Sequence, residues 1–205
     1  EEDDATGFAH LFEHLMFSGS KNFENYDQIV ERLGGESNAF TNNDITNYYL
    51  SVPNMYLQYA LDLEADRMQN LNLNDKSLEV QKNVVIEEFK QRYINQPYGD
   101  LWKQIRELAF TVHPYQHQTI GKCIEHIENV TLETAKQFYK NYYTPSNAVL
   151  AISGDVELND LKRLVENSFG KIPATKTIKK ATRGRFFYKN FFNSAIKVSM
   201  SLNSL

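Results

Sequence analysis

Residues 7–17 read Gly-Phe-Ala-His-Leu-Phe-Glu-His-Leu-Met-Phe, and this stretch decides how the rest of the chain is interpreted. No helix breaker follows its first residue, so it predicts a helix, with Thr6 as the N-cap. At about 100° per residue, His10, Glu13 and His14 fall within one sector roughly 100° wide. The other side chains are almost all apolar, so the helix is expected to be buried around three titratable groups that need a function.

The three polar residues form a metal-ligand pattern. Two imidazoles one helical turn apart can bind one divalent ion, and a carboxylate beside them can reach a water on that ion. The order His-x-x-Glu-His reverses the commoner His-Glu-x-x-His and is a known signature of zinc peptidases. A catalytic zinc also needs a third protein ligand, for which Glu87 and Glu88 are both candidates. Spacing alone does not choose between them, and two ordinary helix histidines beside a surface Glu remain the alternative.

The composition is that of an ordinary globular protein. The chain has 205 residues, 41% of them hydrophobic and 23% charged, which excludes a disordered chain, a collagen-like fibre and a membrane bundle. No apolar stretch reaches the ~18 residues that a membrane-spanning helix needs. Lys and Arg total 22 against 26 Asp and Glu, and the net charge of −4 argues against nucleic-acid binding. Cys123 is the only cysteine, so no intrachain disulfide can form.

The remaining pattern predicts a single α+β domain. Two strand-like stretches, 37–41 and 45–52, flank the turn residues Asn-Asn-Asp and predict a β-hairpin. Helices and strands alternate irregularly after it, which favours a sheet covered by helices over a regular parallel α/β fold. Further helices are predicted at 26–33, 53–71, 75–93, 101–110, 132–142 and 160–169. Further strands are predicted at 148–153, within 185–192 and within 195–202.

Four segments resemble, in order, the N-terminal domain of the pitrilysin-type zinc peptidases, the family of insulysin and the mitochondrial processing peptidase. They are residues 7–17, residues 38–41 (Asn-Ala-Phe-Thr) with 46–49 (Thr-Asn-Tyr-Tyr), residues 84–88 (Val-Val-Ile-Glu-Glu) and residues 142–148 (Tyr-Tyr-Thr-Pro-Ser-Asn-Ala). The resemblance spans nearly the whole chain. It implies the metallohydrolase fold of that family, with a mixed, largely antiparallel sheet covered by helices.

The resemblance also implies the roles of the site residues. It makes Glu88 the third metal ligand beside His10 and His14, and it makes Glu13 the general base. One Zn²⁺ held in this way would lower the pKa of its water toward ~7. Glu13 would take the proton as a peptide carbonyl is attacked and would pass it to the leaving amine. The implied function is a zinc-dependent endopeptidase acting on extended peptides or unfolded polypeptides.

The resemblance places the substrate along the strand at residues 38–41. An extended peptide added at this sheet edge would gain main-chain hydrogen bonds without much demand on its sequence. An ordinary hairpin strand remains the alternative. The expected substrate-binding residues are Asn38, Ala39, Phe40 and Thr41.

One position departs from the family pattern. Many members carry a further Glu seven residues before the ligand Glu, where this chain has Gln81. At i, i+7 Gln81 faces the same side of the helix as Glu88 and can orient a ligand or a water, but it supplies no charge. Gln81 and Glu87 are therefore expected to support the metal site without binding the ion.

Two other functions fit parts of the pattern. The His-x-x-Glu-His motif together with the distant Cys123 resembles the iron or zinc site of S-ribosylhomocysteine lyase. Cysteine is a good ligand for these metals. The second alternative function is that of a non-catalytic partner or scaffold subunit of a peptidase complex. Such relatives typically lack part of the metal motif, which is complete here.

His113 and His117 are expected to be loop residues, because Pro114 disfavours a shared helical turn. The basic run at 176–185 is expected to be a solvated surface or linker.

The length of the chain acquires a meaning from the resemblance. The first residue is Glu1 rather than Met, and the predicted metal-binding helix begins close to it. Family members place strands before this helix and carry a second, similar half that closes over the substrate. We therefore expect residues 1–205 to form one catalytic-type domain without its first strands, acting with a second homologous half or subunit and cleaving poorly alone. The sequence indicates neither a compartment nor a particular substrate.

Overall fold

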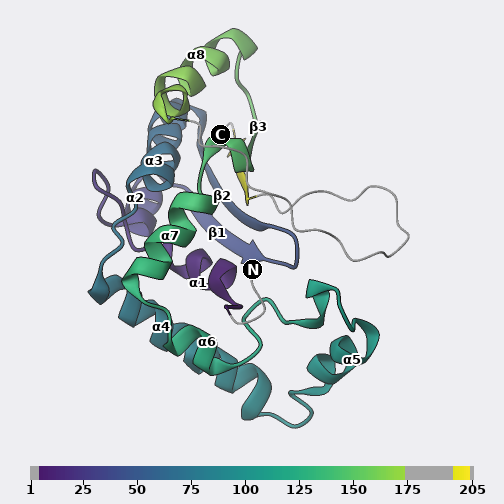
Figure 1. The fold of residues 1–205 in the computed structure, drawn as a ribbon. Helices are drawn as coiled ribbons and strands as arrows, with labels where there is room; N and C mark the ends of the chain where they lie inside the picture. The colour runs from purple at the N-terminus through teal and green to yellow at the C-terminus, as the bar shows by residue number, and fades with distance from the viewer. Residues whose placement is uncertain (1–4, 174–195, 204–205) are drawn as a thin grey trace.

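A computed structural model describes residues 5–173 and 196–203 of the chain. This part of the chain contains one four-stranded sheet with helices packed against it, so the predicted α+β class is confirmed (Figure 1). The strands follow the order β1-β2-β4-β3. Their bounds are β1 Glu36–Thr41, β2 Thr46–Pro53, β3 Ala148–Ser153 and β4 Ile196–Asn203.

The sheet has mixed pairing, as expected, but in different proportions. β1 and β2 pair antiparallel, whereas β4 runs parallel to both of its neighbours, β2 and β3. Among the described strands, antiparallel pairing is therefore confined to the hairpin rather than predominant. The physical reason is connectivity, because parallel neighbours need a crossover and the helix α8 lies between β3 and β4 in the chain. The strand expected within 185–192 lies outside the described residues.

The β1–β2 hairpin forms where the sequence predicts it, because its turn residues hold one another. The Asn42 Oδ1 accepts hydrogen bonds from the backbone N–H groups of Asp44 and Ile45, each at 2.9 Å. This Asx arrangement closes the turn without a glycine. Along β1, Ser37, Ala39 and Thr41 are half-buried, whereas Glu36, Asn38 and Phe40 are exposed. One face of this strand therefore packs toward the interior of the domain.

The helices form close to their predicted positions. Every predicted helix is present in the described residues, and one short helix, α6, forms in addition. The helix predicted at 75–93 is α-helical up to Phe89, and the chain continues from there as a π-helical turn, Lys90–Ile94. No described helix has both the length and the apolar character needed to cross a membrane. The bounds are α1 Phe8–Leu15, α2 Tyr26–Arg32, α3 Leu57–Asn70, α4 Asp75–Phe89, α5 Leu101–Ala109, α6 Ile124–Glu128, α7 Leu132–Tyr142 and α8 Leu158–Ser168.

The N-cap position of helix α1 is a glycine, so the prediction of Thr6 as its N-cap is wrong. The N-cap is Gly7, with a φ of 91° and no capping side chain. The Thr6 Oγ1 instead accepts a hydrogen bond from the Lys122 N–H at 2.8 Å and lies 2.9 Å from the His126 Nδ1. A Cβ at position 7 would lie only 2.5 Å from the carbonyl oxygen of Ile120. Position 7 therefore needs glycine both for its left-handed backbone and for this close approach.

The apolar side of α1 anchors the helix in the core. Leu11, Phe12 and Leu15 are fully buried, and each such side chain contributes roughly 1.5–3 kcal/mol by leaving water. The ring of Phe12 lies 5.0 Å from that of Phe138 on α7 and 5.3 Å from that of Tyr143. Helix α1 thus lies fixed between the β1–β2 hairpin and α4 (Figure 1).

A buried ion pair ties α3 to α2 and β2. Arg67 on α3 is 2% exposed and donates to Glu64 from Nε at 3.0 Å and from Nη2 at 2.7 Å. Its guanidinium lies 4.2 Å from the ring centroid of Tyr26, 4.8 Å from that of Tyr48 and 5.5 Å from that of Phe17. The Tyr26 hydroxyl donates to the other oxygen of Glu64. The carboxylate and three aromatic rings together compensate a positive charge inside the domain.

We expect Glu64→Gln to lower the free energy of unfolding by about 3 kcal/mol, because it leaves the buried Arg67 charge without its partner. Urea unfolding followed by circular dichroism measures this change. The matched control is Glu79→Gln, because Glu79 pairs with Lys82 at the surface and its side chain is 66% exposed. That variant should change stability by less than about 0.5 kcal/mol. Equal losses in the two variants would contradict the prediction.

Candidate metal centre

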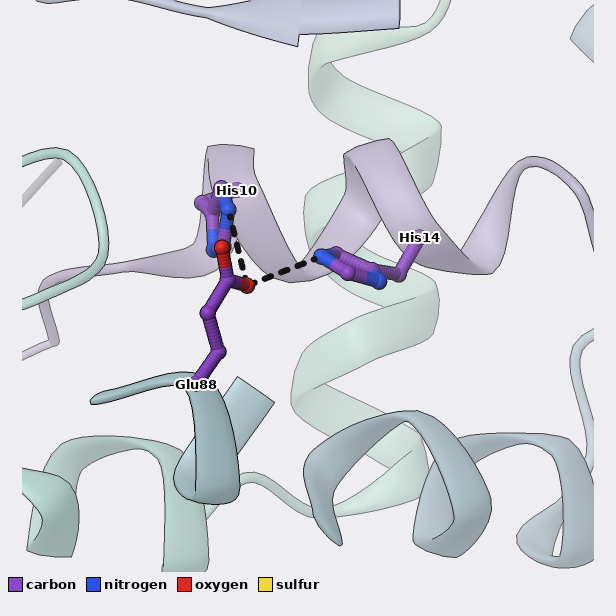
Figure 2. A group of neighbouring side chains, drawn as sticks. All are labelled: His10, His14 and Glu88. Atoms are coloured by element: carbon purple, nitrogen blue, oxygen red, sulfur yellow. Dashed lines mark ion pairs between the residues drawn. The ribbon is translucent and has the colours of Figure 1, made fainter. Parts of the chain in front are cut away.

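Two helices bring three potential metal ligands together. His10 and His14 lie one turn apart on α1, and Glu88 approaches them from α4 (Figure 2). The Glu88 Oε2 lies 3.5 Å from the Nε2 of His10 and 3.4 Å from the Nε2 of His14. Both imidazoles therefore face the same carboxylate oxygen. Among the described residues, these three side chains form the one group of His, Cys, Asp or Glu with this geometry.

The donor set of this group fits a zinc ion. One ligand atom from each side chain lies within 4.8 Å of the other two. The Glu88 Oε2 is buried and has no hydrogen-bond donor, which is costly for a carboxylate unless a cation or a donor compensates it. Two imidazole nitrogens and one carboxylate oxygen are ligands that Zn²⁺ prefers, and three protein ligands leave a position open. The group is thus suited to a catalytic rather than a closed structural site.

The electrostatics of His10 favour binding as a neutral ligand. His10 is 6% exposed, and this burial lowers its pKa to about 4, against the opposing effect of the Glu88 carboxylate. The imidazole is therefore uncharged at neutral pH and has a nitrogen lone pair to offer. The side chain of His14 is 25% exposed, so this imidazole lies on the solvent side of the group.

Arg92 supports the Glu88 carboxylate, and the sequence interpretation missed it. Its Nη2 lies 2.5 Å from the Glu88 Oε1, which leaves Oε2 turned toward the imidazoles. Arg92 comes from the π-helical turn after α4, where the i, i+4 spacing of Glu and Arg was the available signal. Glu87, expected to support the site, instead pairs with Lys90 at 2.7 Å and is mostly exposed. Gln81 is half-buried and makes no hydrogen bond to Glu88, so its supporting role stays a prediction.

The expected base lies between the histidines and the hairpin. Glu13 is half-buried on α1, and its Oε2 accepts a hydrogen bond from the Thr41 Oγ1 at the end of β1. Among the strand residues expected to bind substrate, Asn38 and Phe40 are exposed, whereas Ala39 faces the core. The Ala39 N–H donates to the Asn38 Oδ1 at 2.8 Å. β1 lies at the edge of the sheet in the described part of the chain.

The other candidate residues lie apart from this group. Cys123 precedes α6 and does not belong to the group formed by the histidines and Glu88, so the structure does not favour the lyase interpretation. His113 and His117 flank a short 3-10 turn, Pro114–Gln116, as expected of loop residues. The basic run at 176–185 lies outside the described residues.

The fold and the site together define a class of protein. The inverted His-x-x-Glu-His motif of zinc peptidases lies here on a buried helix beside the hairpin, and a carboxylate from a second helix faces both histidines. The model of the insulinase family, peptidase family M16, matches residues 1–122, and that of the M16 inactive domain matches residues 129–201. The chain therefore belongs to peptidase family M16, and the family resemblance read from the sequence is confirmed.

Curated relatives include named proteases. The chain is 37% identical over 166 residues to the zinc protease PqqE of Helicobacter pylori, which covers 80% of this chain and 37% of that protein. It is 28% identical over 207 residues to the mitochondrial-processing peptidase subunit beta of Neurospora crassa, covering 97% of this chain and 42% of that protein. The chain thus spans less than half the length of these relatives.

Solved structures share the fold. The crystal structure of a protease from Helicobacter pylori matches with a TM-score of 0.75 and 30% identity, covering 91% of this chain and 45% of that one. The first half of the periplasmic protease PqqL from Escherichia coli matches with a TM-score of 0.73 and 22% identity, covering 89% of this chain and 40% of that one. The second match shows the fold alone.

We expect Glu88→Gln to weaken zinc binding by this chain about 100-fold or more, because an amide supplies no negative charge to the group. Competition with a chromogenic chelator measures the affinity. His113→Ala removes an imidazole outside the group and should leave the affinity within about twofold, which controls for general loss of histidine. Wild-type affinity in Glu88→Gln would show that the ion binds elsewhere.

Proposed function

We propose that this chain is the metal-binding part of a zinc-dependent endopeptidase that hydrolyses extended peptides or unfolded polypeptides. The observation that carries the proposal is the single Glu88 oxygen facing both imidazoles of α1, with Glu13 on the same helix. All four side chains lie within residues 1–122, which match the insulinase family model rather than that of the inactive domain. This placement favours a catalytic part over a non-catalytic scaffold.

In this proposal, His10, His14 and Glu88 hold Zn²⁺. Bound zinc supplies a Lewis acid that makes water acidic near neutral pH and polarises a carbonyl oxygen. Glu13 takes the proton of the attacking water and passes it to the leaving amine, as a general base that becomes a general acid. Arg92 keeps the Glu88 carboxylate in place by holding the oxygen that does not face the imidazoles.

The substrate in this proposal is an extended peptide added to β1. A strand at a sheet edge offers unpaired main-chain groups along its outer side. The Ala39 N–H now donates to the Asn38 side chain, and a substrate carbonyl would take the place of that oxygen. Phe40, 45% exposed on the same strand, offers an apolar surface to a substrate side chain. Such binding depends on backbone conformation more than on sequence.

The proposed partner is a second homologous half or subunit that closes the substrate chamber. Support comes from the lengths, because the matched relatives are more than twice as long as the part that this chain covers. The fold adds to this support, because the chain resembles the first half of the protease PqqL and covers about a fifth of the PqqL chain solved at greater length. A chamber wall supplied by another half would exclude water and hold the peptide on β1.

We expect Glu13→Gln in the complete gene product to lower kcat by roughly 10²–10⁴-fold while zinc affinity stays within about twofold. The amide cannot accept the proton, but it does not belong to the ligand group. Hydrolysis of a quenched fluorescent peptide measures kcat, with chelation and zinc restoration as a check on metal dependence. Glu79→Gln, an exposed glutamate on α4, is the control. Unchanged turnover by Glu13→Gln would refute the assignment of the base.

We also expect the isolated chain, fully loaded with zinc, to turn over the same peptide roughly 100-fold or more slowly than the complete gene product. The metal group is contained in this chain, whereas the proposed second wall of the chamber is not. Measuring both proteins at equal zinc occupancy distinguishes an effect of metal loading on turnover from an effect of the missing chamber wall. Equal turnover would contradict the need for a second half.

A further inference from the structure

Two threonine hydroxyl groups form a hydrogen-bond relay from the hairpin to Glu13. Thr41, at the end of β1, lies directly opposite Thr46, at the start of β2. Their Oγ1 atoms are 3.2 Å apart, and the Thr41 Oγ1 also donates a hydrogen bond to the Glu13 Oε2. Thr46 is 3% exposed, so this hydrogen-bond relay runs from the protein interior to the expected base.

The number of protons available fixes which hydroxyl donates to which acceptor in this relay. A carboxylate only accepts hydrogen bonds, and a threonine hydroxyl has one proton to donate. The Thr41 proton goes to Glu13, so the contact between the two threonines must use the proton of Thr46. The Thr41 hydroxyl thus holds Oε2 of Glu13, and in the described part of the chain no hydrogen bond is made to Oε1, which is the less engaged oxygen. The arrangement thus distinguishes two otherwise equivalent oxygens.

We propose that Thr41 is a positioning residue that fixes the orientation of the Glu13 carboxylate through this hydrogen bond. The inference rests on the proposed role of Glu13 as the base. A general base must hold its accepting oxygen within hydrogen-bond reach of the water, and a misplacement of about 1 Å can cost 100-fold in rate. Hydrogen bonds to charged groups are stronger than those between neutral groups, so one hydroxyl can supply this restraint.

The position of Thr41 in the chain adds a consequence for substrate binding. Thr41 lies two residues beyond Ala39 on β1, the strand proposed to receive the peptide. The base is therefore attached to the same rigid strand that would set the register of the substrate. No such link would exist if Glu13 were held only by its own helix. The hydroxyl should act on the chemical step, because it touches the base and not the ligand group.

The test compares hydroxyl-free and hydroxyl-retaining variants of the complete, zinc-loaded gene product. Thr41→Val keeps the shape and the strand preference of threonine but removes the donor. We expect kcat to fall roughly 10- to 100-fold, with KM and zinc affinity within about twofold. Thr41→Ser restores the hydroxyl and should return kcat to within about threefold of wild type. Thr41→Ala, a second hydroxyl-free variant, should match Thr41→Val, so misfolding of one variant does not decide the result.

The control is Ser37→Ala, which removes a hydroxyl from the same side of β1, where Ser37 bonds Asp27 rather than Glu13. Its kcat should stay within about twofold of wild type. Wild-type kcat in both hydroxyl-free variants would overturn the proposal, as would an equal loss in Thr41→Ser. A loss expressed in KM or in zinc affinity would also overturn it, because it would show a structural or binding role.

Glu13→Gln in the same assay separates this inference from the proposed function. If Glu13→Gln is as active as wild type, the proposed base is wrong, and the role of Thr41 falls with it. If Glu13→Gln is inactive while Thr41→Val is fully active, only the positioning role fails. Adding Thr41→Val to Glu13→Gln should produce no further loss, because both changes would act through one group.

Discussion

The packing of α1 against α4 is the contact on which the candidate metal centre depends. Two of its side chains come from α1 and the third from α4, and no local turn of the chain could bring them together. Burial of Leu11, Phe12 and Leu15 holds α1 in the core, so the direction of its polar side is set by the packing of its apolar side. The opposite neighbour of α1 is the hairpin, to which Glu13 is bonded. One short helix thus joins the candidate metal ligands to a sheet edge.

Two ionic groups in the described part of the chain differ in how completely their charges are paired. Arg67 is paired with the Glu64 carboxylate and surrounded by three aromatic rings, although its Nη1 has no hydrogen-bond partner among the described residues. Glu88 has only one of its oxygens compensated, by Arg92 at the rim, while the buried one lacks any donor. Removing one member of the first group would leave a buried charge without its partner. The second keeps an unpaired carboxylate oxygen facing two imidazole nitrogens, which suits cation binding.

Local signals in the sequence predicted the local parts of the molecule well. The α1 motif, the Asx turn of the hairpin and most helices follow from periodicity and turn chemistry, and all are present in the structure. Glu88 could be chosen over Glu87 only through the family resemblance, because both fit the spacing. Arg92 lies four residues after Glu88, a spacing that predicts an ion pair on any helix, so the sequence held the signal for this contact. Parallel pairing by β4 is a long-range contact that no local pattern encodes.

The separation of the three ligands along the chain has a consequence for folding. Synthesis from the N-terminus produces both histidines long before Glu88, so a growing chain carries the two imidazoles before it carries the carboxylate. The carboxylate joins them only when α4 docks on α1. By linkage, an ion that binds all three side chains stabilises the docked arrangement by RT ln(1 + [L]/Kd). Ion binding and the docking of two distant helices would then be linked, and a bound ion would add to the stability that the apolar contacts of α1 already provide.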